Sequence, residues 1–306
     1  MEALRTPDDR FANLPDFPYG PSYLEDLQGY EGLRAAIIDE GPKDAEHTFL
    51  CLHGEPTWSF LYRKMIPVFL ASGARVVAPD LFGFGRSDKP VNDADYSFHF
   101  HRRSLLRLIE RLDLTNITLV VQDWGGVLGL TLPVDPGARA RITGLIVMNT
   151  GIAVGEPITD GFRAWRAFAV TQPDLAVGDL MKRSTPILNA AEVAAYDAPF
   201  PDQRFKAGAR AFPTLVMTDP GMPGIKESKA ALAYWANSWG GRTFMAYGAA
   251  DPVFPPAQME ALRANIHGCP PAYVIPDGGH FIQEWGGQIA QRALDAFAGQ
   301  TPDLEV

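Results

Sequence analysis

The sequence of 306 residues predicts an α/β fold in which a mostly parallel central sheet is flanked by helices and interrupted by a helical insertion. Short apolar runs recur along the chain between turn residues, as is typical of strands buried on both faces. Segments with helical spacing alternate with these runs, which favours a parallel sheet covered on both sides. The expected strands are residues 33–38, 48–52, 75–78, 117–121, 145–148, 243–247 and 273–275, and the expected helices are 98–112, 256–266 and 282–297.

The insertion is the stretch from about Thr150 to Pro220, where no comparably strong strand pattern appears. It is rich in Ala, Pro and aromatic residues and has helical spacing at 162–170 and 190–196. We interpret 150–220 as a helical cap over one edge of the sheet, with 1–149 and 221–306 forming the core. The alternative is an independent domain, but no flexible Gly/Ser linker flanks the segment.

Composition and charge narrow the range of partners. Hydrophobic residues make up 46% of the chain and its net charge is −9, so nucleic acid and anionic membranes are poor partners. The N-terminus has neither a basic nor an apolar leader region, and no apolar stretch approaches the length of a membrane span. Cys51 and Cys269 do not resemble a disulfide framework, so we expect a cytoplasmic protein.

A nucleophile elbow follows the strand at 117–121. The strand runs into Gln122-Asp123-Trp124-Gly125-Gly126, a tight turn whose small residues can begin a closely packed helix. The match is partial, because Val121 stands where the pattern usually has Gly and the apex is Asp123 instead of Ser. The alternative is that Asp123 only caps the helix.

A carboxylate at the apex changes the chemistry that the elbow can support. It is ionised at neutral pH and can attack saturated carbon that carries a good leaving group. The product is an alkyl ester on the enzyme. Hydrolysis of this ester requires a base for water and an oxyanion hole.

Other strand ends supply candidates for these roles. In His53-Gly54-Glu55-Pro56, the Glu55 N–H can pair with the Trp124 N–H as an oxyanion hole. Asp251 and His280 follow the last two expected strands. Taken singly, each could be an ordinary turn or surface residue. However, the chain order nucleophile, acid, histidine is that of the α/β-hydrolase triad.

Taken together, these motifs resemble those of the haloalkane dehalogenases of the α/β-hydrolase superfamily, in the branch whose catalytic acid follows the later strand. The resemblance covers nearly the whole chain. Asp-Trp at the elbow together with a tryptophan in the cap is its most specific feature. It is carried by residues 53–58, 79–88, 121–126, 160–165, 248–251 and 278–281.

The resemblance implies hydrolysis of short haloalkanes to alcohol, halide and a proton through an aspartyl ester. Asp123 would be the nucleophile, His280 the base and Asp251 the residue that orients it, while the indoles of Trp124 and Trp165 would bind the departing halide. Glu55 would also help to place the water. The expected partners are a small apolar halogenated substrate, halide and water, with no metal or other cofactor, and we expect a monomer. The expected pocket residues are Val127, Phe162, Phe212, Val253 and Phe254.

The nearest alternative function is that of a soluble epoxide hydrolase, which shares the fold and the Asp nucleophile. It would require cap tyrosines to protonate an alkoxide, and the insertion contains only Tyr196. A hydrolase of halogenated acids would need arginines after the elbow, where the chain has Gly125, Gly126, Val127 and Leu128. A non-catalytic binding protein is disfavoured because the triad is complete.

Overall fold

The central feature of the computed structural model, which describes residues 1–156 and 158–299, is an eight-stranded sheet. Its strand order is β10-β9-β8-β7-β4-β5-β3-β2. Pairing is parallel from β10 through β5 and antiparallel at β3 and β2, so the expectation of a mostly parallel sheet is confirmed. The strands are β2 (Ser22–Leu24), β3 (Ala35–Glu40), β4 (Thr48–Leu52), β5 (Arg75–Pro79), β7 (Ile117–Val121), β8 (Ile142–Met148), β9 (Arg242–Gly248) and β10 (Tyr273–Ile275).

Parallel register brings the carboxyl ends of the inner strands to one edge of the sheet. Val121, the last residue of β7, pairs with Leu52 on one side and with Val147 on the other. Gly248 at the end of β9 pairs with Ile275 at the end of β10. The loops that follow these strands therefore emerge together, where ligands bind in open α/β sheets.

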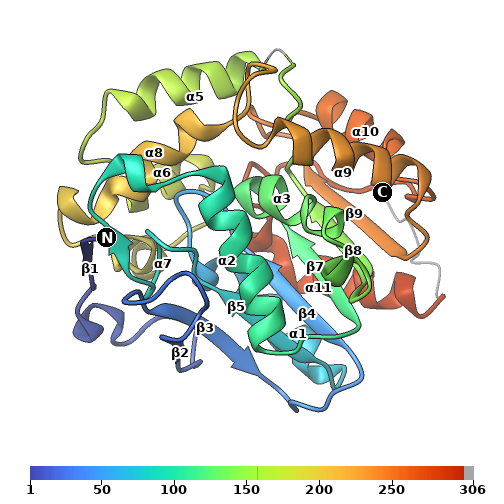
Figure 1. Ribbon diagram of the computed structural model, residues 1–306, viewed down its shortest axis with the longest axis horizontal. Coiled ribbons are helices and arrows are strands. Elements are labelled where there is room, and N and C mark those ends of the chain that lie inside the picture. Colours follow the sequence, from blue (N-terminus) through green and yellow to red (C-terminus); the bar gives the residue numbers. More distant parts are fainter. Residues whose placement is uncertain (157, 300–306) are drawn as a thin grey trace.

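Helices lie on both sides of the sheet (Figure 1). α1 packs against β5, α11 packs against β9, and these two helices contact each other. α3 packs against β4, β7 and β8, and α2 packs on α3. β1 (Ala3–Leu4) and β6 (Lys89–Pro90) form a separate two-stranded ribbon. The helices are α1 (Ile66–Ala71), α2 (Phe98–Arg111), α3 (Asp123–Gly129), α4 (Pro136–Arg139), α5 (Asp160–Val170), α6 (Val177–Ser184), α7 (Ala190–Asp197), α8 (Ala207–Leu215), α9 (Ile225–Asn237), α10 (Pro256–Ala264) and α11 (Gly286–Phe297).

The insertion after β8 is helical and contains α5 to α8. Figure 1 shows α5 crossing the top of the molecule with α8 and α6 just below it, and α7 further down. α5 packs on α8, and α6 packs on α7. The sequence pattern indicated α5 and α7 but not α6 and α8. Pro213 lies inside α8, and α6 is short and charged, so neither helix has a long apolar period.

A buried ionic cluster ties the insertion to the core. Arg63 is 1% exposed and donates to Glu192 of α7 at 2.7 Å and to Glu284, just before α11, at 2.6 and 2.7 Å. The Tyr196 hydroxyl also donates to Glu284. Because a buried charge needs complete pairing, this cluster fixes α7 in one position on the core.

Apolar side chains from both sides of the sheet form one continuous core. Among the described residues, no helix is long and apolar enough to cross a membrane.

Candidate active site

Asp123 occupies a strained corner between β7 and α3. Its φ is +48°, a left-handed conformation that non-glycine residues adopt only when their surroundings enforce it. Its N–H donates to the Asn149 carbonyl at 3.0 Å, and its own carbonyl accepts from the Thr150 hydroxyl at 2.7 Å. A side chain on Gly125 would overlap the Leu52 carbonyl. The elbow pattern thus identified the corner correctly, even with Val121 in place of Gly.

The carboxylate of Asp123 lies between a backbone donor and an imidazole. Its Oδ1 accepts from the Glu55 N–H at 2.8 Å, and its Oδ2 is 3.4 Å from His280 Nε2. Trp124 is the second residue of α3, where a backbone N–H has no acceptor within the helix. One backbone donor, the Glu55 N–H, therefore contacts this carboxylate directly, as one half of an oxyanion hole would.

The loop that carries Glu55 is held by the buried ring of His53. Its Nδ1 lies 2.8 Å from the Gly54 carbonyl, and its Nε2 accepts from the Leu81 N–H at 2.9 Å. A side chain on Gly54 would overlap the Asp123 carboxylate. The His-Gly pair therefore allows the Glu55 N–H to approach the nucleophile closely.

Asp251 orients His280, as the strand-end order indicated. His280 Nδ1 lies 2.8 Å from Asp251 Oδ2. The carboxylate of Asp251 also accepts from Asn149 Nδ2 at 2.8 Å and from the Val253 N–H at 2.7 Å. Gln122 Nε2 donates to the His280 carbonyl at 3.0 Å. We did not identify Asn149 and Gln122 from the sequence, although each follows a recognised strand.

These neighbours set the charge of His280. Burial alone would lower its pKa, but the carboxylates of Asp251 and Asp123 raise the pKa to about 10. The imidazole of the free protein is therefore protonated at neutral pH. This proton stabilises the fold fully below about pH 6.5, and the contribution is lost as the pH rises towards 10.

The two other acidic groups of the site differ in their ionisation. Burial would raise the pKa of Asp251, but the charge and hydrogen bond of His280, together with backbone donors, lower it. Glu55 is 4% exposed, and burial followed by the charge of Asp123 raises its pKa well above the ordinary value. The surroundings therefore favour the neutral form of Glu55 and the ionised form of Asp251.

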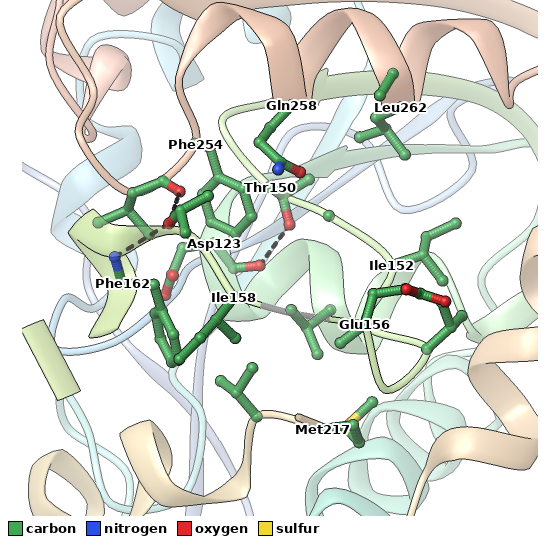
Figure 2. A pocket seen from close by; sticks show the side chains of 18 of the residues that line it. Asp123, Thr150, Ile152, Glu156, Ile158, Phe162, Met217, Phe254, Gln258 and Leu262 are labelled. Carbon is green, nitrogen blue, oxygen red and sulfur yellow. Dashed lines mark hydrogen bonds between the residues drawn. The ribbon is translucent and has the colours of Figure 1, made fainter. Parts of the chain in front are cut away.

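A cavity of about 420 Å³ opens beside Asp123 and Trp124. Figure 2 shows Asp123, Phe162 and Phe254 around one part of it and Ile152, Glu156 and Met217 around another. The predicted residues Val127, Phe162, Val253 and Phe254 line it, together with apolar side chains from the loop after β8 and from α10. Apolar walls suit a neutral substrate.

Two predicted residues do not line this cavity. Phe212 of α8 is fully buried, and its ring packs edge-on against Trp124 with a centroid distance of 4.8 Å, so it supports the indole from behind. Trp165 is half-buried on α5, one turn after Phe162, with its ring 6.1 Å from that of Phe168. The structure brings Trp124 to the nucleophile but does not place Trp165 among the lining residues.

The groups expected of the rival chemistries are not at the cavity. Among the residues described, no tyrosine lines it, and Tyr196 is fully buried against Glu284. No cluster of His, Cys, Asp and Glu with the arrangement of a metal site occurs within 1–156 and 158–299. The groups that do meet the Asp123 carboxylate are the Glu55 N–H and the His280 ring.

Comparison with known proteins agrees with this arrangement. A family model of the alpha/beta hydrolase fold matches residues 47–287. A haloalkane dehalogenase of Psychrobacter cryohalolentis is 42% identical over 99% of this chain and 100% of its own, and one of Mycolicibacterium paratuberculosis is 41% identical over 96% and 98%. The solved tetrameric haloalkane dehalogenase DpaA of Paraglaciecola agarilytica is 53% identical, with a TM-score of 0.95 over 97% of this chain and 99% of that one.

The charge assignment can be tested by NMR titration of the His280 imidazole. Asp251→Asn and Asp123→Asn should each lower the pKa of His280, since each removes a negative charge that raises it. The larger fall is expected for Asp251→Asn. Asp113→Asn changes a surface carboxylate that is 81% exposed and is the matched control. A pKa unchanged by both site variants would contradict the assignment.

Proposed function

The chain belongs to the haloalkane dehalogenases of the α/β-hydrolase fold, and from this premise we propose that Asp123, Asp251 and His280 carry out its hydrolysis of carbon–halogen bonds. The observation that carries the proposal is the position of Asp123. Its carboxylate lies at the cavity, 2.8 Å from the Glu55 N–H and 3.4 Å from the His280 ring.

In the first step, one carboxylate oxygen of Asp123 attacks the carbon that bears the halogen. The carbon–oxygen bond forms as the carbon–halogen bond breaks, and the halogen leaves with the bonding electrons. The Trp124 indole, which borders the cavity, donates to the departing halide. Because negative charge grows on the halogen only as the bond breaks, this donor favours the transition state over the neutral substrate.

In the second step, water hydrolyses the aspartyl ester at its carbonyl carbon. Alkylation removes the negative charge of Asp123, which lowers the pKa of His280, so the imidazolium releases its proton to solvent and the neutral ring then accepts a proton from the attacking water. The N–H groups of Glu55 and Trp124 stabilise the oxyanion. The side chain of Glu55 helps to hold the attacking water. Collapse of the intermediate releases the alcohol and restores the carboxylate.

We also propose that Trp165 supplies the second halide donor, as the sequence motif predicts, and that 150–220 acts as a cap. The support for Trp165 is its place on α5 one turn after Phe162, which lines the cavity. A cytoplasmic location remains a prediction, supported by the two free cysteines.

Trapping the ester tests the two-step scheme. His280→Gln removes the base but leaves the nucleophile, so a bromoalkane should add one alkyl group to the protein, detectable by intact mass and located on Asp123 by peptide mapping. Bromide release should stop after about one equivalent. Asp123→Ala in the same background is the control and should gain no mass. An unmodified His280→Gln protein after exposure would overturn the scheme.

The role of Trp165 is tested with Trp165→Phe, which keeps an aromatic ring but removes the indole donor. We expect kcat/KM for a chloroalkane to fall about tenfold or more, because one donor to the leaving group is lost, and quenching of tryptophan fluorescence by halide to weaken. Trp285→Phe makes the same change outside the cavity lining. Equal turnover and equal quenching in the two variants would remove Trp165 from the halide site.

The oligomeric state is open to a direct measurement. The sequence led us to expect a monomer, whereas DpaA, with 53% identity and a TM-score of 0.95, is described as tetrameric. We propose that this chain also self-associates, since so similar a fold can present similar surfaces. Light scattering coupled to size exclusion should give a mass several times 33.4 kDa, and a mass of one chain would restore the monomer expectation.

A further inference from the structure

The cavity extends well beyond the carboxylate of Asp123. Its volume of about 420 Å³ falls within the range of roughly 300–1,000 Å³ that accommodates drug-sized ligands. α10 begins two residues after Phe254, whose ring stacks on that of His280, and it contributes Gln258 and Leu262 to the lining. These two residues stand one helical turn apart, so the cavity follows α10 away from the triad by about 5 Å per turn.

One amide in this extension is free to bind a ligand. Gln258 is a solvent-exposed residue whose side chain has no hydrogen bond to any described residue, and Figure 2 shows it reaching from α10 on the side of Phe254 and Thr150. By contrast, the hydroxyls of Thr150 and Thr159 donate to the carbonyls of Asp123 and Val253. An unengaged amide can both donate and accept a hydrogen bond.

The charged side chains that line the described part of the cavity are all acidic. Its charged side chains within the described chain are Asp123 and Glu156, both carboxylates, with no Lys or Arg among them. Glu156 has no ion pair with a described residue and lies beside Ile152 in Figure 2. A carboxylate on a substrate would therefore meet repulsion without a compensating cation.

We propose that this cavity selects elongated haloalkanes carrying an uncharged hydrogen-bonding group, such as a hydroxyl, which Gln258 binds, and that Glu156 disfavours substrates carrying a carboxylate. The proposal rests on the proposed function of Asp123. A hydroxyl that enters an apolar cavity must exchange its water for another partner, and the Gln258 amide supplies one. The apolar walls bind the intervening methylene groups.

Three substrates that share a chain and a carbon–bromine bond test the role of Gln258: 1-bromohexane, 6-bromohexan-1-ol and 6-bromohexanoate. Gln258→Leu should lower the ratio of kcat/KM for the alcohol to that for the alkane by about two- to tenfold, the range for one net hydrogen bond. Asn265→Leu is the control, because its amide also borders the cavity but already donates to the Ala261 carbonyl. A ratio unchanged in Gln258→Leu would overturn this part.

Glu156 is tested with the carboxylate substrate. Glu156→Gln should raise kcat/KM for 6-bromohexanoate about two- to tenfold and leave that for 1-bromohexane unchanged, and added salt should reduce the difference between the proteins. Asp160→Asn makes the same charge change on a fully exposed side chain of α5 outside the lining and should have little effect. If kcat/KM for 6-bromohexanoate rose equally in Glu156→Gln and Asp160→Asn, the effect would come from net charge, and the role of Glu156 would be overturned.

The same measurements distinguish failure of the proposed hydrolysis from failure of the selectivity proposal. If wild-type protein releases no bromide from any of the three substrates, the proposed function itself fails. If it hydrolyses 1-bromohexane but neither variant alters selectivity, the triad assignment stands and the selectivity proposal alone fails.

Discussion

The rest of the site depends on holding one carboxylate at a backbone corner that aspartate does not favour by itself. Asp123 has a φ of +48° because β7, the Asn149 carbonyl and the Thr150 hydroxyl fix the turn from both sides. This backbone conformation directs the side chain beyond the sheet edge, where its carboxylate accepts a hydrogen bond from the Glu55 N–H. A relaxed backbone would turn the carboxylate away from the cavity, so the strain is part of how the nucleophile is presented.

That position also explains the electrostatic balance around His280. Asp123 and Asp251 contact the two nitrogens of one buried imidazole, and their charges raise its pKa, while burial and the charge of Asp123 raise the pKa of Glu55. An imidazolium beside the nucleophile cannot remove a proton from water. In the mechanism that we propose, alkylation of Asp123 would remove one of the two charges, so formation of the ester would itself lower the pKa of His280 before the next step.

Sequence patterns predicted the parts of this site that sit on strands. Buried parallel strands give uninterrupted apolar runs, so the ends of β4, β7, β9 and β10 were located to within a residue, and with them the loops that carry Glu55, Asp123, Asp251 and His280. Asn149 follows a strand in the same way and could have been found by the same rule. β1 and β6 have only two residues each, which is too short for a recognisable period.

The cap is less predictable because its side-chain directions are set by tertiary packing. Spacing places Phe162 and Trp165 on neighbouring parts of α5, yet only Phe162 borders the cavity. Phe212 lies behind Trp124 because α8 is packed into the aromatic core. At α7, the buried ion pair between Arg63 and Glu192 attaches the insertion to the core. Both contacts join residues far apart in the sequence, so helical spacing within the insertion could not predict them.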